Sequence, residues 1–140
     1  MVADDVDALQ QLYMAARIAT FDWLPPKLFK LEDLQKSIEG EWVFVAIIDG
    51  EIAGFCSIWL IENFIHNLFV APNSQGGNIG KSLINYAFAH GLKKPARLKC
   101  TVKNTNACGF YTANGWVVEQ ANVENNNDLS DDPYHLFVLT

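Results

Sequence analysis

Residues 64–82 read FIHNLFVAPNSQGGNIGKS, and this stretch decides the fold that we expect. Residues 64–70 form a short β-rich apolar run, and the run ends at Pro72 because proline cannot donate to a strand ladder. A glycine-rich turn follows at residues 74–80. Apolar residues then recur at helical spacing, at Ile79, Leu83 and Ala87, with neighbouring Ile84 and Phe88. The sequence therefore predicts a strand, a glycine-rich turn and a helix in direct succession.

A turn of this kind is suited to binding an anion. Backbone N–H groups at the start of a helix have no partner within it, and their partial positive charge favours a phosphate or pyrophosphate. Glycines let the anion approach the backbone closely, and Asn78 tolerates a left-handed conformation better than most residues. A flexible turn that only begins a helix is the alternative interpretation.

Two nucleotide-binding motifs do not fit the same residues. A Walker A loop has four residues between its two glycines, whereas Gly76 and Gly80 enclose three. The Rossmann fingerprint Gly-x-Gly-x-x-Gly is missing as well, and no parallel strand–helix repeat follows. We therefore do not expect a P-loop or a dinucleotide fold.

The segments around the central stretch predict a mixed α/β (α+β) fold in one domain, residues 1–140. Asp4 or Asp5 can cap the first helix. Asp49-Gly50 is a strong hairpin signal between two β-rich runs. In chain order we expect a first helix ending by Pro25-Pro26, a helix at 31–38, strands at 42–48, 52–60 and 64–70, the central helix, a strand at 97–102, a short helix around 107–111, and strands at 116–119 and 135–139 around an acidic loop, 122–132.

The composition disfavours several classes of protein. Ten Lys and Arg against 16 Asp and Glu give a net charge of −6, which argues against nucleic-acid binding and suits a cationic small molecule or basic peptide. No run approaches the ~20 apolar residues of a membrane-spanning helix, and the chain begins without a signal-peptide pattern. Cys56, Cys100 and Cys108 lack metal-site spacing and have apolar neighbours. We therefore expect core cysteines, no metal and a cytoplasmic protein.

Two motifs resemble those of the GCN5-related N-acetyltransferase (GNAT) family. The main motif, Gln/Arg-x-x-Gly-x-Gly/Ala after a strand, matches residues 75–80, with Asn78 in place of the first glycine. The second motif, Asn-x-x-Ala-x-x-Phe-Tyr-x-x-x-Gly-Phe, matches Asn104, Ala107, Phe110, Tyr111 and Gly115, with Trp116 in the final aromatic place. Family members usually begin with a strand before the first helix, and residues 1–3 provide only a stub of one.

The resemblance implies a fold and a reaction. The fold is a twisted, mixed and mostly antiparallel sheet of about six to seven strands flanked by about four helices. Two central strands splay apart in this family, and they correspond here to residues 64–70 and 97–102. The reaction uses acetyl-CoA as donor and a primary amine as acceptor, with direct attack and no covalent enzyme intermediate.

The resemblance also implies where the coenzyme binds. Its pyrophosphate would contact the turn, and its pantetheine arm the strand before it. A β-bulge near Asn67 would re-aim backbone groups there to polarise the thioester carbonyl. Lys81 is either a further contact or a solvated helix lysine, and Asn104 either contacts pantetheine or only caps the next helix. The coenzyme-binding candidates are Leu68, Phe69, Val70, Gln75, Gly76, Gly77, Asn78, Ile79, Gly80, Lys81, Asn104, Ala107, Phe110 and Tyr111.

Tyr111 and His66 are the catalytic candidates. Tyr111 resembles the family's general acid, which protonates the departing CoA thiolate; a tyrosine packed on the sheet is the alternative. The attacking amine must lose a proton, and the family has no fixed base. His66 has the intrinsic pKa range of a base, although a lone strand histidine can also be structural. Glu62, His135 and a chain of waters are the other candidates.

The acceptor pocket in this family is bounded by the first two helices and their connection, where this chain has Asp22 and Trp23. An aromatic wall with one carboxylate suits an apolar amine or a peptide N-terminus. Trp23 can equally anchor the helix junction. Asp22, Trp23 and Glu62 are the substrate-binding candidates.

The sequence thus predicts an N-acetyltransferase acting on a primary amine of a small molecule or peptide. The alternative is a catalytically silent acyl-CoA-binding sensor on the same fold. Homodimers are frequent in the family, and the sequence leaves the oligomeric state open.

Overall fold

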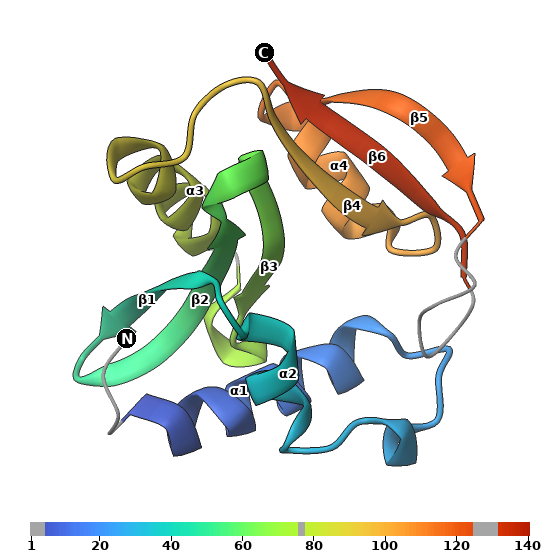
Figure 1. Cartoon of the computed structure of the whole chain (residues 1–140). Coiled ribbons are helices and arrows are strands. Elements are labelled where there is room, and N and C mark those ends of the chain that lie inside the picture. Colours follow the sequence, from blue (N-terminus) through green and yellow to red (C-terminus); the bar gives the residue numbers. More distant parts are fainter. Residues whose placement is uncertain (1–4, 76–77, 125–131) are drawn as a thin grey trace.

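The computed structural model describes residues 5–75, 78–124 and 132–140. Over these residues the chain forms a mixed six-stranded sheet with helices on both faces (Figure 1). The helices are α1 (Val6–Thr20), α2 (Asp33–Ile38), α3 (Ile79–Ala89) and α4 (Thr105–Ala113), with 3₁₀ turns η2 (Pro26–Leu28), η3 (Leu60–Glu62) and η4 (Pro72–Ser74); the strands are β1 (Trp42–Ile48), β2 (Glu51–Trp59), β3 (Phe64–Val70), β4 (Ala96–Thr101), β5 (Val117–Val123) and β6 (Tyr134–Leu139). The predicted mixed fold is confirmed.

The strand order is β1-β2-β3-β4-β6-β5, and β3 and β4 are parallel neighbours in an otherwise antiparallel sheet. These two strands pair only at Phe64 with Arg97 and at Ile65 with Leu98. Beyond Ile65 they diverge, as Figure 1 shows. The predicted splay of the central strands is therefore confirmed, and it opens the middle of the sheet.

A β-bulge lies at the point where β3 leaves β4. Ser57 of β2 pairs with Asn67, but the next residue, Ile58, pairs with Ile65, so His66 is the extra residue. The bulge reverses the alternation of the strand: Ile65 and Leu68 pack in the core under α3, whereas Phe69 packs with α1. The bulge thus falls one residue before Asn67. Asn67 itself is buried and donates hydrogen bonds to the hydroxyls of Ser37 and Ser57, at 2.8 and 2.9 Å, which explains its polarity in an apolar strand.

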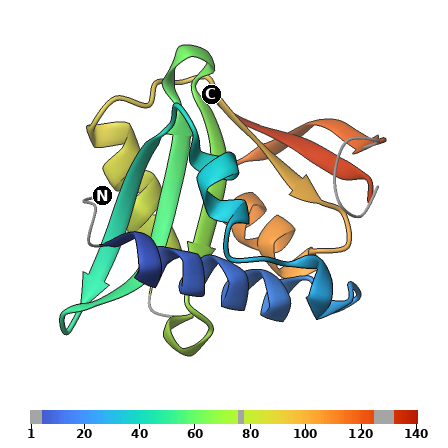
Figure 2. The same cartoon turned by 60° about the horizontal axis from the view of Figure 1, so that its bottom comes forward.

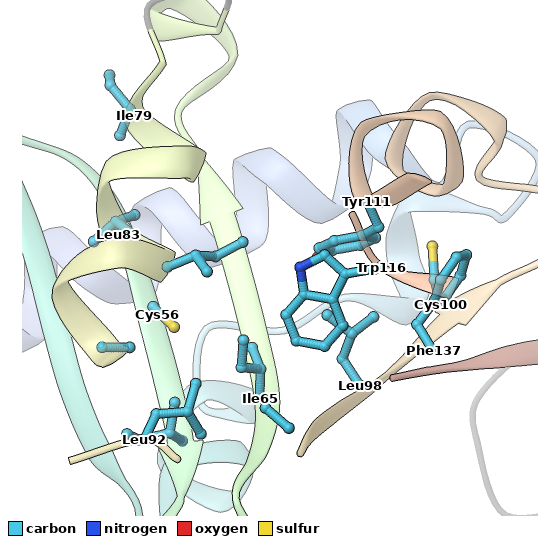
Figure 3. Packing of buried hydrophobic residues seen from close by; sticks show 14 of the residues in the cluster. Cys56, Ile65, Ile79, Leu83, Leu92, Leu98, Cys100, Tyr111, Trp116 and Phe137 are labelled. Carbon is cyan, nitrogen blue, oxygen red and sulfur yellow. The ribbon is translucent and has the colours of Figure 1, made fainter. Parts of the chain in front are cut away.

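Two hydrophobic clusters hold the helices on the sheet. In Figure 2, α1 crosses one face of β1–β3 and α3 lies behind them. The cluster under α1 and α2 contains Leu9, Leu12, Tyr13, Ala16, Leu34 and Phe55. The larger cluster joins α3 and α4 to the opposite face, and Figure 3 shows Tyr111 and Trp116 side by side within it. The apolar stripes predicted for α1 and α3 are therefore the faces that become buried.

Two sequence signals explain the local geometry of the sheet. Asp49 and Gly50 both have positive φ, 52° and 80°, as a two-residue hairpin turn requires. Gly54 of β2 lets α3 lie close to the sheet, since a Cβ there would be 2.9 Å from the Phe69 carbonyl oxygen and 3.3 Å from Leu83.

The predicted boundaries are most accurate near the centre of the chain. The strands expected at 42–48 and 64–70 coincide with β1 and β3. The strand expected at 116–119 is wrong in its extent: β5 runs from Val117 to Val123, because Trp116 is turned into the core and is 1% exposed. Residues 1–3 and most of the predicted loop lie outside the described residues. Within the described part, no helix is long and apolar enough to cross a membrane.

Candidate active site

The start of α3 has the backbone geometry that the glycine-rich motif predicts. Asn78 adopts the left-handed conformation, with φ 61° and ψ 17°. Its carbonyl accepts the Ser82 N–H at 3.0 Å, so the amides of Ile79, Gly80 and Lys81 belong to the first turn and have no acceptor within the helix. Asparagine and glycine both reach this conformation, which explains why Asn78 can replace the motif glycine. Gly76 and Gly77 lie outside the described residues.

A cavity of about 480 Å³ opens beside this helix start. It lies between the end of β3, the first turn of α3, one side of α4 and the end of α1. Most of the predicted coenzyme residues line it: Leu68, Phe69, Val70, Gln75, Asn78, Ile79, Gly80, Asn104, Ala107, Phe110 and Tyr111. Ala19, Thr20, Asp22, Pro72, Ser74 and Asn106 complete the wall. Asp22 was predicted to lie in the pocket for the acceptor amine. None of the others is a specified residue of the two sequence motifs.

The edge of β3 that faces this cavity is without a strand partner in the described structure. Pairing with β4 stops at Ile65, so the edge beyond it can bond a ligand instead of a strand. The Val70 carbonyl accepts a long hydrogen bond, 3.5 Å, from the Gln75 side chain. This weak contact is one that a bound amide can replace.

Helix α4 forms the opposite wall and is held close to α3. Asn104 caps it, because its Oδ1 accepts the Ala107 N–H at 3.2 Å. Gly80 faces the Phe110 ring, and a Cβ at Gly80 would be 3.4 Å from Phe110 Cζ. The capping role weighed for Asn104 is thus observed, in a residue that also lines the cavity.

Tyr111 lines the cavity from α4 and is 8% exposed. Its ring packs against Trp116 and Phe137, with centroids 6.0 and 5.8 Å away. Burial, and then the nearby thiols of Cys100, Cys56 and Cys108, raise the pKa of Tyr111 well above 10. The hydroxyl therefore stays protonated at neutral pH, and the raised pKa makes it a weaker acid than the hydroxyl of a free tyrosine.

His66 does not line the cavity but lies at the bulge, two residues before Leu68. Its Nδ1 is 2.6 Å from Oε2 of Glu41, the residue just before β1. The hydrogen bond to Glu41 raises the pKa of His66, and burial opposes this only in part. The sequence gives no sign of this pair, because Glu41 lies 25 positions away and belongs to no motif.

Three further candidate residues, Trp23, Glu62 and His135, do not line the cavity. Trp23 donates from Nε1 to Oδ2 of Asp132 at 2.6 Å, and Lys103 Nζ is 3.1 Å from the other oxygen. Glu62 is exposed in η3, at the end of β3 away from the cavity. His135 accepts the Asn122 N–H at 3.2 Å.

Lys81 is exposed and does not line the cavity of about 480 Å³. It lines a second cavity of about 370 Å³ with Lys94 and Trp116.

Cys56 and Cys100 are buried in the core, as predicted, and Cys108 is partly buried against it. All three are free, and Cys100 and Cys108 lie with their sulfur atoms 3.4 Å apart. Burial raises the pKa of Cys56 to about 12. Among the described residues, no group of three or more His, Cys, Asp or Glu could hold a metal ion.

Comparison with known proteins agrees with this geometry. Residues 6–116 match the model of the Acetyltransferase (GNAT) family. A Bacillus subtilis protein named "Putative ribosomal protein bS18-alanine N-acetyltransferase" is 34% identical over 68 residues, and the match spans 45% of this chain and 45% of that protein, so less than half of the relative's length is matched.

Two solved structures share the fold. The ribosomal-protein-S18-alanine N-acetyltransferase of Escherichia coli superposes with a TM-score of 0.75 at 15% identity, over 99% of this chain and 89% of that one. The PaiA N-acetyltransferase of Thermoplasma acidophilum, solved in complex with coenzyme A, gives a TM-score of 0.75 at 20% identity, over 97% and 94%. Because the family model spans β3, the turn, α3 and α4, this chain belongs to the GNAT acetyltransferase family.

Proposed function

We propose that this chain, with residues 1–140 acting as one domain, transfers the acetyl group of acetyl-CoA directly to a primary amine in a ternary complex. One observation carries the proposal: the free edge of β3, the first turn of α3 and the hydroxyl-bearing Tyr111 border a single cavity. Its volume, about 480 Å³, lies within the range of roughly 300–1,000 Å³ that small-molecule sites occupy.

The residues present fit the coenzyme. Three backbone amides at the start of α3, those of Ile79, Gly80 and Lys81, can hold the pyrophosphate. The exposed edge of Leu68–Val70 can bond the amides of the pantetheine arm. Asn104, Ala107 and Phe110 form the wall opposite. Acetyl-CoA supplies the activated acetyl group as a thioester.

The chemistry needs one proton donor and one proton acceptor. As the amine nitrogen bonds to the carbonyl carbon, the carbon–sulfur bond breaks and Tyr111 gives its proton to the departing sulfur. Backbone N–H groups of β3 stabilise the negative charge that develops on the carbonyl oxygen. His66 removes one proton of the incoming ammonium and releases it to solvent. The nitrogen loses a second proton as the amide forms, and transfer of that proton through solvent restores the Tyr111 hydroxyl.

The acceptor would approach from the connection after α1. Asp22 lines the cavity there and provides a carboxylate for a cationic amine. Trp23, the next residue, is fixed by its hydrogen bond to Asp132 and does not line the cavity. Glu62 has no part in the proposal, because it lies at the other end of β3. The names of the two S18-alanine acetyltransferases make a peptide N-terminus one acceptor worth testing.

Release of the CoA thiol, measured with a thiol-reactive dye, tests the proposal. The acceptor panel consists of a polyamine, an amino-acid amide and a peptide with N-terminal alanine. We expect amine-dependent thiol release above the rate with acetyl-CoA alone. Coenzyme binding by calorimetry without turnover of any amine would instead support the acyl-CoA sensor. No coenzyme binding would contradict both functions.

A further inference from the structure

Glu41 has a buried carboxylate that is only partly hydrogen-bonded. Its side chain is 8% exposed, and one oxygen, Oε1, is buried without a hydrogen-bond partner among the described residues. The other oxygen lies 2.6 Å from His66 Nδ1. A buried carboxylate with an unpartnered oxygen is unfavourable for folding, and replacing such pairs by apolar residues is often neutral or stabilising. Stability alone therefore gives little reason for a carboxylate here.

The pair controls which nitrogen of His66 can take up a proton. Glu41 engages Nδ1, so the hydrogen of the neutral ring is held on Nδ1 and the lone pair is on Nε2. A carboxylate fixes the tautomer of a catalytic histidine in the same manner in serine hydrolases. The His66 side chain is 46% exposed, so the ring can exchange protons with a ligand or with water.

The backbone places His66 beside the proposed site, although its side chain does not line the cavity. His66 is the bulge residue, and the last β3–β4 pair, Ile65 with Leu98, immediately precedes it. Leu68, two residues later, already lines the cavity. The imidazole thus lies where the strands begin to diverge, on the α2 side of the sheet.

Groups from three segments of the chain act on the His66 ring. Glu41 precedes β1, Lys99 lies on β4, and the Ser37 backbone on α2 also interacts with the ring. The hydrogen bond with Glu41 is the largest influence and raises the pKa of His66; burial and Lys99 lower it. Cys56, near Glu41, is a neutral thiol because burial raises its pKa to about 12. A higher pKa of His66 lies closer to the pKa of an ammonium group, so proton transfer from the ammonium to His66 becomes less unfavourable.

We infer that Glu41 is a positioning residue for deprotonation of the acceptor amine: its carboxylate orients His66 so that Nε2 takes the ammonium proton. The inference rests on the proposed acetyl transfer and adds a residue outside both family motifs. The ammonium N–H bond breaks, the proton moves to Nε2, and the resulting imidazolium is stabilised by the Glu41 charge. Solvent then takes the proton from the exposed ring.

The test combines pH–rate profiles with NMR titration of the histidine rings. Glu41→Gln keeps the size and a hydrogen-bonding group but removes the charge, and His66→Asn removes the base. For Glu41→Gln we expect kcat/KM for the amine to fall about tenfold at the high-pH plateau, and the acid limb of the profile to move to lower pH. KM for acetyl-CoA should not change. The His66 ring should titrate at lower pH in the same variant.

His90→Asn is the matched control, since His90 stacks on Tyr86 at the far end of α3. The titrations of His90 and His135 should be unaltered in Glu41→Gln, which reports that the fold is intact. A Glu41→Gln enzyme with the wild-type pH profile overturns the inference, even if the His66 titration moves. A wild-type protein that binds CoA but acetylates no amine overturns the proposed function first, and the two failures are thereby distinguished.

Discussion

Replacing Gly80 by glutamate should abolish coenzyme binding through charge. Gly80 lies in the first turn of α3 and lines the cavity, so a side chain there extends toward the proposed pyrophosphate. Two like charges about 4 Å apart repel by about 4 kcal/mol at an effective dielectric constant of ~20. Since each 1.4 kcal/mol is about a tenfold change in Kd, the expected loss is about a thousandfold.

Gly80→Ala separates this charge effect from crowding. The alanine Cβ would be 3.4 Å from Phe110 Cζ and 3.8 Å or more from its other nearby ring atoms, which is ordinary contact. Alanine is also favoured over glycine within a helix by about 1 kcal/mol. We therefore expect Gly80→Ala to melt at the wild-type temperature or above and to bind CoA with little change.

Isothermal titration calorimetry with CoA at two salt concentrations provides the assay. The loss in Gly80→Glu should shrink at higher ionic strength, because salt screens exposed charges. Wild-type affinity in Gly80→Glu would refute the assigned pyrophosphate position. An equal loss in Gly80→Ala would show that space, and not charge, governs the site.

Four further substitutions test separate parts of the account. Tyr111→Phe should lower kcat about a hundredfold with little change in KM, because the ring contacts survive and only the proton donor is lost. Asn104→Ala should destabilise the protein by about 1 kcal/mol in urea unfolding, through loss of the α4 cap, and should raise KM for acetyl-CoA. Gly54→Ala should destabilise by about 1–3 kcal/mol, since its Cβ meets a backbone oxygen at 2.9 Å. Glu41→Gln should lower the free energy of unfolding more at about pH 5.5 than at about pH 8.5. The pair with Glu41 raises the pKa of His66 in the folded protein. The stabilisation by the pair is therefore complete below the pKa of His66 in the unfolded chain, near 6.5, and is lost as the pH rises through the folded pKa.

Matched controls exist for these variants. Tyr86→Phe alters a half-exposed tyrosine on the outer side of α3 and should leave kcat unchanged. Gly109→Ala adds a methyl group where nothing lies within 4 Å, so it should not destabilise. An unchanged kcat in Tyr111→Phe would remove this residue from the mechanism. Equal effects of Glu41→Gln at the two pH values would mean that the ion pair does not stabilise the fold.

Local signals in the sequence predicted the centre of the fold well. The Asp49-Gly50 turn and the run at 64–70 are set by neighbouring residues, and their positive φ angles and strand bounds are those observed. The family motifs likewise predicted most residues that line the cavity, since a strand, a turn and two helices fix them together. Asn78 illustrates why the motif tolerates change: the backbone conformation is required there, and glycine is only one way to reach it.

Contacts between distant segments could not be predicted. The pairing of Trp23 with Asp132 joins residues 109 positions apart, and neither residue lies in a recognisable pattern. The exact position of the bulge is a second example. The resemblance implied a bulge near Asn67, and the structure has it at His66; this one extra residue decides which face of the sheet each later side chain reaches. Only after the bulge is located can Glu41 be recognised as the partner of His66.

Backbone amide NMR during a CoA titration tests the central claim most directly. The account predicts saturable shifts that are largest at Ile79, Gly80 and Lys81, with further shifts along Leu68–Val70. Saturable binding whose shifts are confined to other surfaces, such as the second cavity beside Lys94 and Trp116, would contradict it.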